Sequence, residues 1–245
     1  ISSGFLQALL ADEAAVRLDL DAALGRYERL FAQSFELPFK STEISAFITR
    51  MVAEATQKSV GFPLQVNVSH FTYTRAGETR TITAHLADLP PQQKAQMEQQ
   101  ANQLLAGTDA ARILQGIAFD ALQEGIAYLQ TERKNCTVKQ EAAETADVLV
   151  TGAKQQIMPG LQLRESWFRL DRKAKTISGI NFVFANGTNM LVRLRYRELA
   201  LPGGTSVPIP AEMLIKQNAL ETVGGPKLPP QITVQYGTCT LRPAP

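Results

Sequence analysis

The chain has 245 residues, of which 44% are apolar and 20% are charged, and these values exclude wholesale disorder and a fibrous repeat. Lysine and arginine total 25 against 23 aspartates and glutamates, so the formal charge of +2 gives no chain-wide reason to bind nucleic acid. No apolar stretch reaches the roughly 18 to 20 residues that a membrane-spanning helix needs. We therefore expect a soluble chain, with residues 1–245 folding as a single domain.

The N-terminal segment, residues 1–60, is expected to be helical. Leucines and aromatic residues recur at helical spacing after Asp19, a candidate cap, and Pro38 then marks a break. A second helix follows, because apolar residues continue along one helical face after Ser41 or Thr42, either of which can cap its N-terminus.

The period of the pattern changes to two over residues 62–87. Apolar and polar residues alternate from Leu64 to Ser69, and a second β-rich run extends from Arg80 to Leu86. The turn residues 75–78 separate the two runs. This segment therefore predicts a β-hairpin.

Two more helices are expected over residues 91–130, followed by strands over residues 134–242. The strongest hairpin signal is Asn186-Gly187, because both central residues of a type I′ turn need φ > 0, which Asn and Gly tolerate. The predicted fold class is α+β, with a curved antiparallel sheet covered by helices.

The two cysteines, Cys136 and Cys239, both lie in β-like segments. A disulfide between them would close a loop of about 100 residues and contribute on the order of 4 to 5 kcal/mol in the chain-entropy model. An oxidising compartment would then follow. Two unpaired cysteines are the alternative, because one pair gives no pattern to test.

The only two histidines, His70 and His85, fall in the predicted hairpin. A two-residue turn at Ala76 and Gly77 would place their rings on one face as diagonal neighbours, roughly 7 Å apart between Cα atoms. A zinc site usually needs about three or four ligands, and this face offers threonines instead. We therefore expect hydrogen-bonded strand histidines and no metal.

Catalytic motifs are absent from the sequence. The hydrolase elbow G-x-S-x-G is missing, and the glycine pairs fit neither the P-loop nor the dinucleotide-binding pattern. No pair of carboxylates stands out as an acid and a base. We expect no catalytic residue and no cofactor, and so a protein that is not an enzyme.

A basic ridge is predicted on a single strand. Arg193, Arg195 and Arg197 alternate with apolar residues and so project from one face. The ridge could meet an anionic head group or a carboxylate-rich partner surface. The alternative is that the ridge is simply the solvent-exposed face of a half-buried strand, which antiparallel sheets commonly show.

The opposite face of the same hairpin predicts an apolar wall. Its members are Trp167, Ile180, Phe182, Phe184, Met190, Val192, Leu194 and Tyr196. If helices cover the wall completely, it is core; if the curved sheet leaves space beneath them, it is a pocket for an apolar ligand. The sequence leaves both outcomes open.

Residues 161–217 resemble the periplasmic lipoprotein-carrier superfamily of LolA-like and LolB-like proteins. The matching features are an LD-x-K turn after a strand, a polar hairpin turn, a Y-x-(D/E) strand and a V-P strand; here they fall at Trp167–Lys173, Asn186-Gly187, Tyr196–Leu199 and Val207-Pro208. The resemblance implies an unclosed half-barrel wrapped around helices, an envelope location in a bacterium and a hydrophobic concavity for acyl chains. The long helical N-terminal segment and the two helices after Leu86 depart from the family.

The leading hypothesis is a non-enzymatic, exported protein that binds a lipid, an acyl chain or a lipoprotein-like apolar ligand in its concave sheet. We expect it in the periplasm or associated with the outer membrane, peripheral to the membrane at most, in transport or with an envelope protein as partner. The alternative is a protein-interaction or sensor module that uses the half-barrel as a platform, with the arginine ridge facing the partner.

Overall fold

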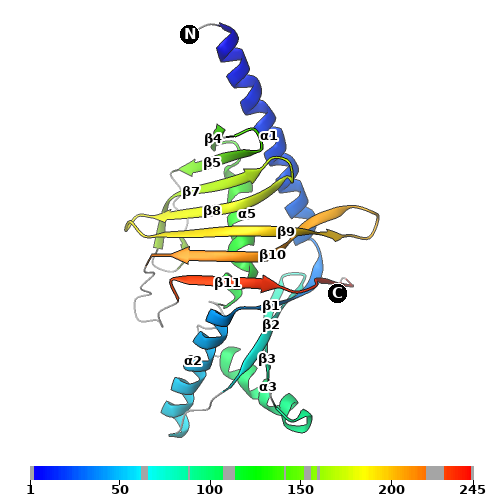
Figure 1. The fold of residues 1–245 in the computed structure, drawn as a ribbon, viewed down its shortest axis with the longest axis vertical. Coiled ribbons are helices and arrows are strands. Elements are labelled where there is room, and N and C mark those ends of the chain that lie inside the picture. The colour runs from blue at the N-terminus through cyan, green and yellow to red at the C-terminus, as the bar shows by residue number, and fades with distance from the viewer. Residues whose placement is uncertain are drawn as a thin grey trace. The chain divides into compact units, whose positions relative to one another are not determined.

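The computed structural model describes residues 3–61, 66–87, 89–106, 114–140, 142–151, 156–158, 161–218 and 229–243. It confirms the α+β class, with helices and a curved, unclosed antiparallel sheet (Figure 1). The chain forms two compact units. The first comprises residues 1–31, 124–210 and 215–220, and the second comprises residues 32–123, 211–214 and 221–245.

The first unit combines antiparallel strands with two helices. Its elements are α1 (Ser3–Phe31), α5 (Ala121–Glu132, from Glu124 onward), β4 (Thr137–Gln140), β5 (Thr145–Thr151), β6 (Gln156–Met158), β7 (Leu161–Asp171), β8 (Thr176–Phe184) and β9 (Asn189–Ala200). The strands follow the order β9-β8-β7-β5-β4, and β6 pairs with β7. Strand β10 (Ser206–Gln217) contributes residues to both units.

The second unit contains the remaining elements. They are β1 (Ser34–Lys40), α2 (Thr42–Val60), β2 (Val68–Ala76), β3 (Thr79–Leu86), α3 (Pro91–Ala106), the π-helix η1 (Gly116–Asp120), β11 (Gln231–Tyr236) and β12 (Thr240–Arg242). The strand order is β3-β2-β1-β11, and β12 also pairs with β1. Residues 62–65 and 107–113, which fall in the predicted hairpin and helices, lie outside the described residues.

Strand β1 lies within the segment expected to be helical. Phe35, Leu37 and Phe39 alternate along it and are each no more than 1% exposed. Pro38 therefore belongs to a strand and does not mark a simple break: its carbonyl accepts a hydrogen bond from Gly237 N at 2.7 Å. A run of only seven residues between two helices carries too short a pattern to separate a strand from a helix end.

Helix α2 begins where its capping residue predicts. Ser41 is extended, and its hydroxyl accepts a hydrogen bond from Ile44 N at 3.3 Å, which confirms it as the N-cap. The apolar face of α2 is buried at Ile44, Phe47, Ile48 and Val52. The helix ends at Gly61, whose φ of 84° is the left-handed conformation that glycine adopts without strain.

The turn at Asn186-Gly187 joins β8 and β9 as predicted, but the predicted turn type is wrong. Gly187 has a φ of 84°, whereas Asn186 has no positive φ. Gly187 N donates to Phe184 O at 3.0 Å, and Phe184 N donates to Thr188 O at 2.9 Å. These bonds define a three-residue loop in which a type I turn is followed by a left-handed glycine.

Within the first unit, helix α1 packs on the strands through one apolar face and a polar contact. Its buried residues recur at helical spacing, namely Val16, Leu20, Ala23, Leu24, Tyr27 and Leu30. Asp19 is not a cap: it lies inside the helix and accepts hydrogen bonds from Arg172 Nε at 2.9 Å and from Lys175. Among the described helices, none is long and apolar enough to cross a membrane.

The disulfide considered from the sequence is not formed. Cys136 and Cys239 are both buried, and neither is in a disulfide. Cys136 Sγ donates to Arg133 O at 3.1 Å, and burial raises the pKa of its thiol even though Arg17 opposes this shift. The oxidising compartment inferred from such a bond therefore has no support from the cysteines.

Candidate ligand-binding site

The covered face of the first unit collects most of the predicted apolar wall. Six of its residues are between 0 and 5% exposed, namely Ile180, Phe182, Phe184, Met190, Val192 and Leu194. The β8–β9 register pairs Ile180 with Val192 and Phe182 with Met190, so the two rows lie side by side. Helix α5 runs behind these strands (Figure 1). In this structure the wall is core.

Trp167 is not part of this wall, and its neighbour Phe168 takes the place predicted for it. Phe168 pairs with Ile180, is fully buried, and meets the Phe182 ring edge-on with 6.4 Å between centroids. Because side chains alternate along a strand, Trp167 projects from the opposite face, where the ammonium of Lys139 lies 5.1 Å from its ring centroid.

Tyr196 closes one end of the wall beneath α1. Its ring meets that of Tyr27 edge-on at 6.0 Å between centroids, and its hydroxyl donates to Ile177 O at 2.7 Å. Tyr27 is fully buried and its hydroxyl accepts a hydrogen bond from Ile177 N at 3.0 Å. Tyr196 therefore anchors α1 to the sheet and is only partly exposed.

Gly125 brings α5 into direct contact with the wall. A Cβ atom at this position would lie 3.2 Å from Ile180 Cδ1 and 3.3 Å from Phe182 Cζ. Such distances are tighter than ordinary van der Waals contact. The helix is therefore seated on the phenylalanine-bearing strands, and a ligand could reach the wall only if α5 moved away from them.

Two buried hydroxyl groups interrupt this apolar interior, and sequence reasoning missed both. Ser166 is 0% exposed and Tyr128 on α5 is 5% exposed, yet neither hydroxyl has a hydrogen-bond partner in the part of the chain that the structure describes. Both are neighbours of Phe168, since Ser166 lies two residues before it on the same face of β7 and the Tyr128 ring lies 6.5 Å from its ring. The available signal was a serine at an inward position of a strand.

Burial extends the pH range over which the Tyr128 hydroxyl stays neutral. Desolvation, with a smaller effect from Glu132, raises the pKa of its hydroxyl to about 12. The group is neutral at physiological pH, as an ordinary tyrosine is, and can both donate and accept a hydrogen bond. Together, Tyr128 and Ser166 offer two polar groups inside a surface that is otherwise aliphatic and aromatic.

The predicted arginine ridge lies on the face opposite the wall. Arg193 and Arg195 are exposed, and Arg197 is half-buried. Arg193 pairs across the sheet with Gly179, which presents no side chain. The first two arginines are therefore accessible from solvent, as the alternation of the strand predicts.

The two histidines lie closer together than predicted, in the second unit. The turn falls at Gly77-Glu78, one residue later than expected, and this moves the register by two so that His70 faces His85 directly. Their rings stack at 4.3 Å with 12° between planes. His70 Nδ1 is 2.9 Å from Ser69 Oγ, and His85 Nε2 is 3.0 Å from Thr72 Oγ1. Among the described residues no group of three or more His, Cys, Asp and Glu could hold a metal ion.

No family model, curated protein or solved structure matches this chain. The similarity to lipoprotein carriers therefore stays a prediction. The covered face of β7–β9 is the candidate ligand site on the strength of its own contacts.

Proposed function

We propose that this protein is a non-enzymatic binding protein that takes up an acyl chain or a similar apolar ligand between α5 and strands β7–β9. The observation that carries the proposal is the pair of partnerless buried hydroxyls, on Tyr128 and Ser166, inside an apolar interior. They stand where the polar end of an amphipathic ligand would need hydrogen bonds.

The energetics favour a ligand with one polar end. A buried hydroxyl without a partner costs about 1 to 3 kcal/mol, so two of them destabilise the unliganded core. A carboxyl or ester oxygen placed between Tyr128 and Ser166 would recover this cost, while the hydrocarbon chain replaced the contacts that α5 makes with Phe168 and Phe182. Burial of each methylene group would add about 0.8 kcal/mol.

Helix α5 has features of an element that can be displaced. Gly125 lies in its interior, where glycine costs roughly 0.8 to 1.0 kcal/mol of helix stability relative to alanine. The helix also continues directly from the π-helix η1, a rare geometry that is frequent at functional sites. The glycine lowers the stability of the helix itself, and the π-helix marks an irregular start to it.

Native mass spectrometry of the protein incubated with oleic acid tests the proposal. We expect a one-to-one complex, and we expect the double substitution Tyr128→Phe with Ser166→Ala to weaken it about tenfold, a loss of roughly 1.4 kcal/mol. Ser178→Ala is the matched control, because that hydroxyl is exposed and already donates to Arg169 O of β7. Failure to retain oleic acid at any ratio would reject the proposal.

A carrier of this kind would act in the periplasm or at the outer membrane of a bacterium, with a lipid or a lipoprotein as cargo. The support is the resemblance of residues 161–217 to lipoprotein carriers. Fractionation of cells that express the full-length protein tests this location, and recovery in the cytoplasm would contradict it.

A second candidate function uses the opposite face of the same sheet. Trp167 and Lys139 form a cation–π pair there, and Arg193 and Arg195 are exposed on β9. Tryptophan and arginine are enriched among the residues that contribute most of the binding energy at protein interfaces. Reversing the charge of Arg193 and Arg195 should then abolish capture of a partner without unfolding the protein, and unchanged capture would reject this role.

A further inference from the structure

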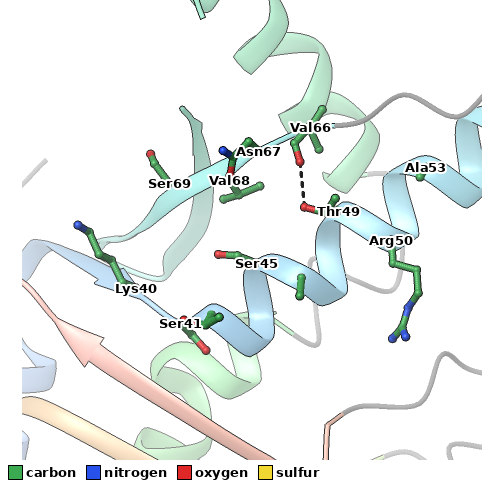
Figure 2. Close-up of a pocket in the computed structure, with 12 residues that line it drawn as sticks. Lys40, Ser41, Ser45, Thr49, Arg50, Ala53, Val66, Asn67, Val68 and Ser69 are labelled. Atoms are coloured by element: carbon green, nitrogen blue, oxygen red, sulfur yellow. Dashed lines mark hydrogen bonds between the residues drawn. The ribbon is translucent and has the colours of Figure 1, made fainter. Parts of the chain in front are cut away.

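A groove of about 930 Å³ lies in the second unit, between helix α2 and the chain that leads into β2 (Figure 2). Its lining residues are Lys40, Ser41, Thr42, Ser45, Ala46, Thr49, Arg50, Ala53, Val66, Asn67, Val68 and Ser69. The groove is separate from the apolar wall, which belongs to the first unit.

One side of the groove is the edge of a strand. Strand β1 runs antiparallel to β2 as far as the pair Phe39 and Phe71, and it ends at Lys40, where the chain turns into α2. Residues 66–69 therefore extend beyond the end of their neighbour. The groove occupies the place that β1 would fill if it continued.

The backbone N–H and C=O groups along this edge point alternately towards β3 and towards α2. Asn67 O accepts a hydrogen bond from Ala87 N at 2.8 Å on the β3 side, whereas Val66 O accepts one from Thr49 Oγ1 at 2.9 Å on the α2 side. Since successive residues of a strand direct their backbone groups to opposite sides, Val68 shares the orientation of Val66. The N–H and C=O of Val68 thus face the groove.

The pairing across β3 supports the same orientation. Val68 pairs with Leu86, and Leu86 N donates outward to Glu98 Oε1 at 2.9 Å, away from β2. A residue pair in which one partner points outward is the non-hydrogen-bonded kind. Val68 therefore does not exchange hydrogen bonds with Leu86.

The lining combines hydroxyl groups with a positive charge at one end. Five of the lining residues carry hydroxyls, namely the N-cap Ser41, then Thr42, Ser45 and Thr49 on α2, and Ser69 on β2, and none of the lining residues is acidic. Lys40 projects at the end nearest Ser69, whereas Arg50 extends away from β2 (Figure 2). His70 lies close to this end; burial first, then the neighbouring His85 and the charges of Lys40 and Lys94, lower its pKa, and Glu98 opposes them in part.

We propose that this groove binds an extended acidic peptide of a partner protein, which adds as a strand beside residues 66–69. Backbone hydrogen bonds to Val68 supply affinity, as in other strand-addition complexes. Alternate side chains of the peptide face the small residues of α2, where Ala46 and Ala53 leave room. Lys40 supplies the preference for a carboxylate.

The test begins with selection from a library of random octapeptides displayed on phage, with the full-length protein as bait. We expect enrichment of acidic sequences without proline. A synthetic copy of the most enriched peptide should slow hydrogen exchange at the Val68 amide. Methylation of alternate amide nitrogens in that peptide should weaken binding about tenfold or more, because a methylated amide cannot donate to a strand. Two methylated peptides cover the two alternating sets of amide nitrogens. If both bind as well as the unmethylated peptide, the proposal is overturned.

Variants of the groove complete the test. Ser45→Tyr fills the groove and Lys40→Glu reverses its charge, and each should weaken binding of the peptide about tenfold. Lys58→Glu is the control, because it makes the same charge change on α2 outside the groove. Selected peptides that are basic, or that bind Ser45→Tyr and Lys40→Glu as they bind the unaltered protein, would exclude the groove as their site. These outcomes are independent of oleic acid binding in the first unit.

Discussion

Two buried tyrosines have opposite hydrogen-bonding states. The Tyr73 hydroxyl donates to Asp120 Oδ1 at 2.8 Å, whereas the Tyr128 hydroxyl has no partner in the described part of the chain. Loss of the first hydroxyl leaves a buried carboxylate short of a donor, so Tyr73→Phe should cost about 1 to 3 kcal/mol of unfolding free energy. Tyr128→Phe should be neutral or slightly stabilising. Urea unfolding measures both, and equal costs would show that Tyr128 has a partner.

His70 should make the stability depend on pH near neutrality. Burial first, then the neighbouring His85, Lys40 and Lys94, lower its pKa, and Glu98 opposes them only in part. An unfolded histidine titrates near about 6.5, so just below that pH the unfolded chain binds more protons than the folded one. The free energy of unfolding should therefore fall as the pH drops through about 6.5. Urea unfolding of His70→Gln should show a smaller fall between about pH 7 and pH 5, and an unchanged profile would contradict this cause.

The sequence analysis placed Trp167 in the apolar wall, but Phe168 lies there, and this error shows where sequence reasoning fails for single residues. Alternation predicts that one of two adjacent aromatic residues faces inward, but not which one. Strand β7 contains register shifts near Leu163 and near Arg169, and each changes the phase of the pattern. The inward Ser166 was unrecognised for the same reason, since its side depends on that phase.

At the scale of elements, Asp19 should hold α1 to the strands through its charge. Burial by itself would raise the pKa of Asp19, but hydrogen bonds from Lys175 and Arg172 outweigh it and lower the pKa. Because the pKa of Asp19 is lower in the folded protein, its carboxylate stabilises the fold fully above the unfolded pKa, about 3.9. This stabilisation is lost as the pH falls through the folded pKa. The protein should lose this contribution only below about pH 4.

The substitution Asp19→Asn removes the stabilisation by the Asp19 carboxylate at neutral pH. We expect a loss of roughly 1.5 to 3 kcal/mol in unfolding free energy, the range for hydrogen bonds to charged groups, together with faster hydrogen exchange in α1. Asp21→Asn is the control, because that side chain is 59% exposed and its ion pair with Arg133 is long, at 3.9 Å. Equal effects of the two substitutions would show that the Asp19 contacts contribute nothing specific.

The seating of α5 predicts opposite effects at two glycines. Gly125→Leu places a side chain against Ile180 and Phe182 and should destabilise the protein by about 1 to 3 kcal/mol through overpacking. Gly116→Ala meets nothing within 4 Å and should stabilise by up to roughly 1 kcal/mol. Thermal unfolding compares them, and a stabilised Gly125→Leu would mean that α5 does not rest on the strands.

Elements with a local signal were predictable, and those without one were not. The cap at Ser41 and the apolar face of α2 depend only on nearby residues, and both are as expected. Strand β1 is short and owes its conformation to pairing with β2 and β11, which are distant in sequence. The type of the Asn186-Gly187 turn likewise depends on the register of β8 and β9.

For the whole molecule, the sequence predicted the fold class because the change from helical to strand periodicity is visible along the chain. The order of the strands was not predictable, since β1 near one end pairs with β11 and β12 near the other. The candidate site was predicted in part: the wall residues of β8 and β9 lie together, but their cover by α5 arises from tertiary packing. The hydroxyls of Tyr128 and Ser166 became visible only once burial was known.

Energy transfer from Trp167 tests the central claim most directly. Trp167 is the only tryptophan of the chain and stands on β7 beside Phe168, so a fluorescent fatty acid such as cis-parinaric acid under α5 would accept its excitation. The account predicts saturable quenching of Trp167 with sensitised emission of the probe at one site per chain, weakened by Tyr128→Phe with Ser166→Ala. Absence of sensitised emission below the concentration at which the fatty acid aggregates would contradict it.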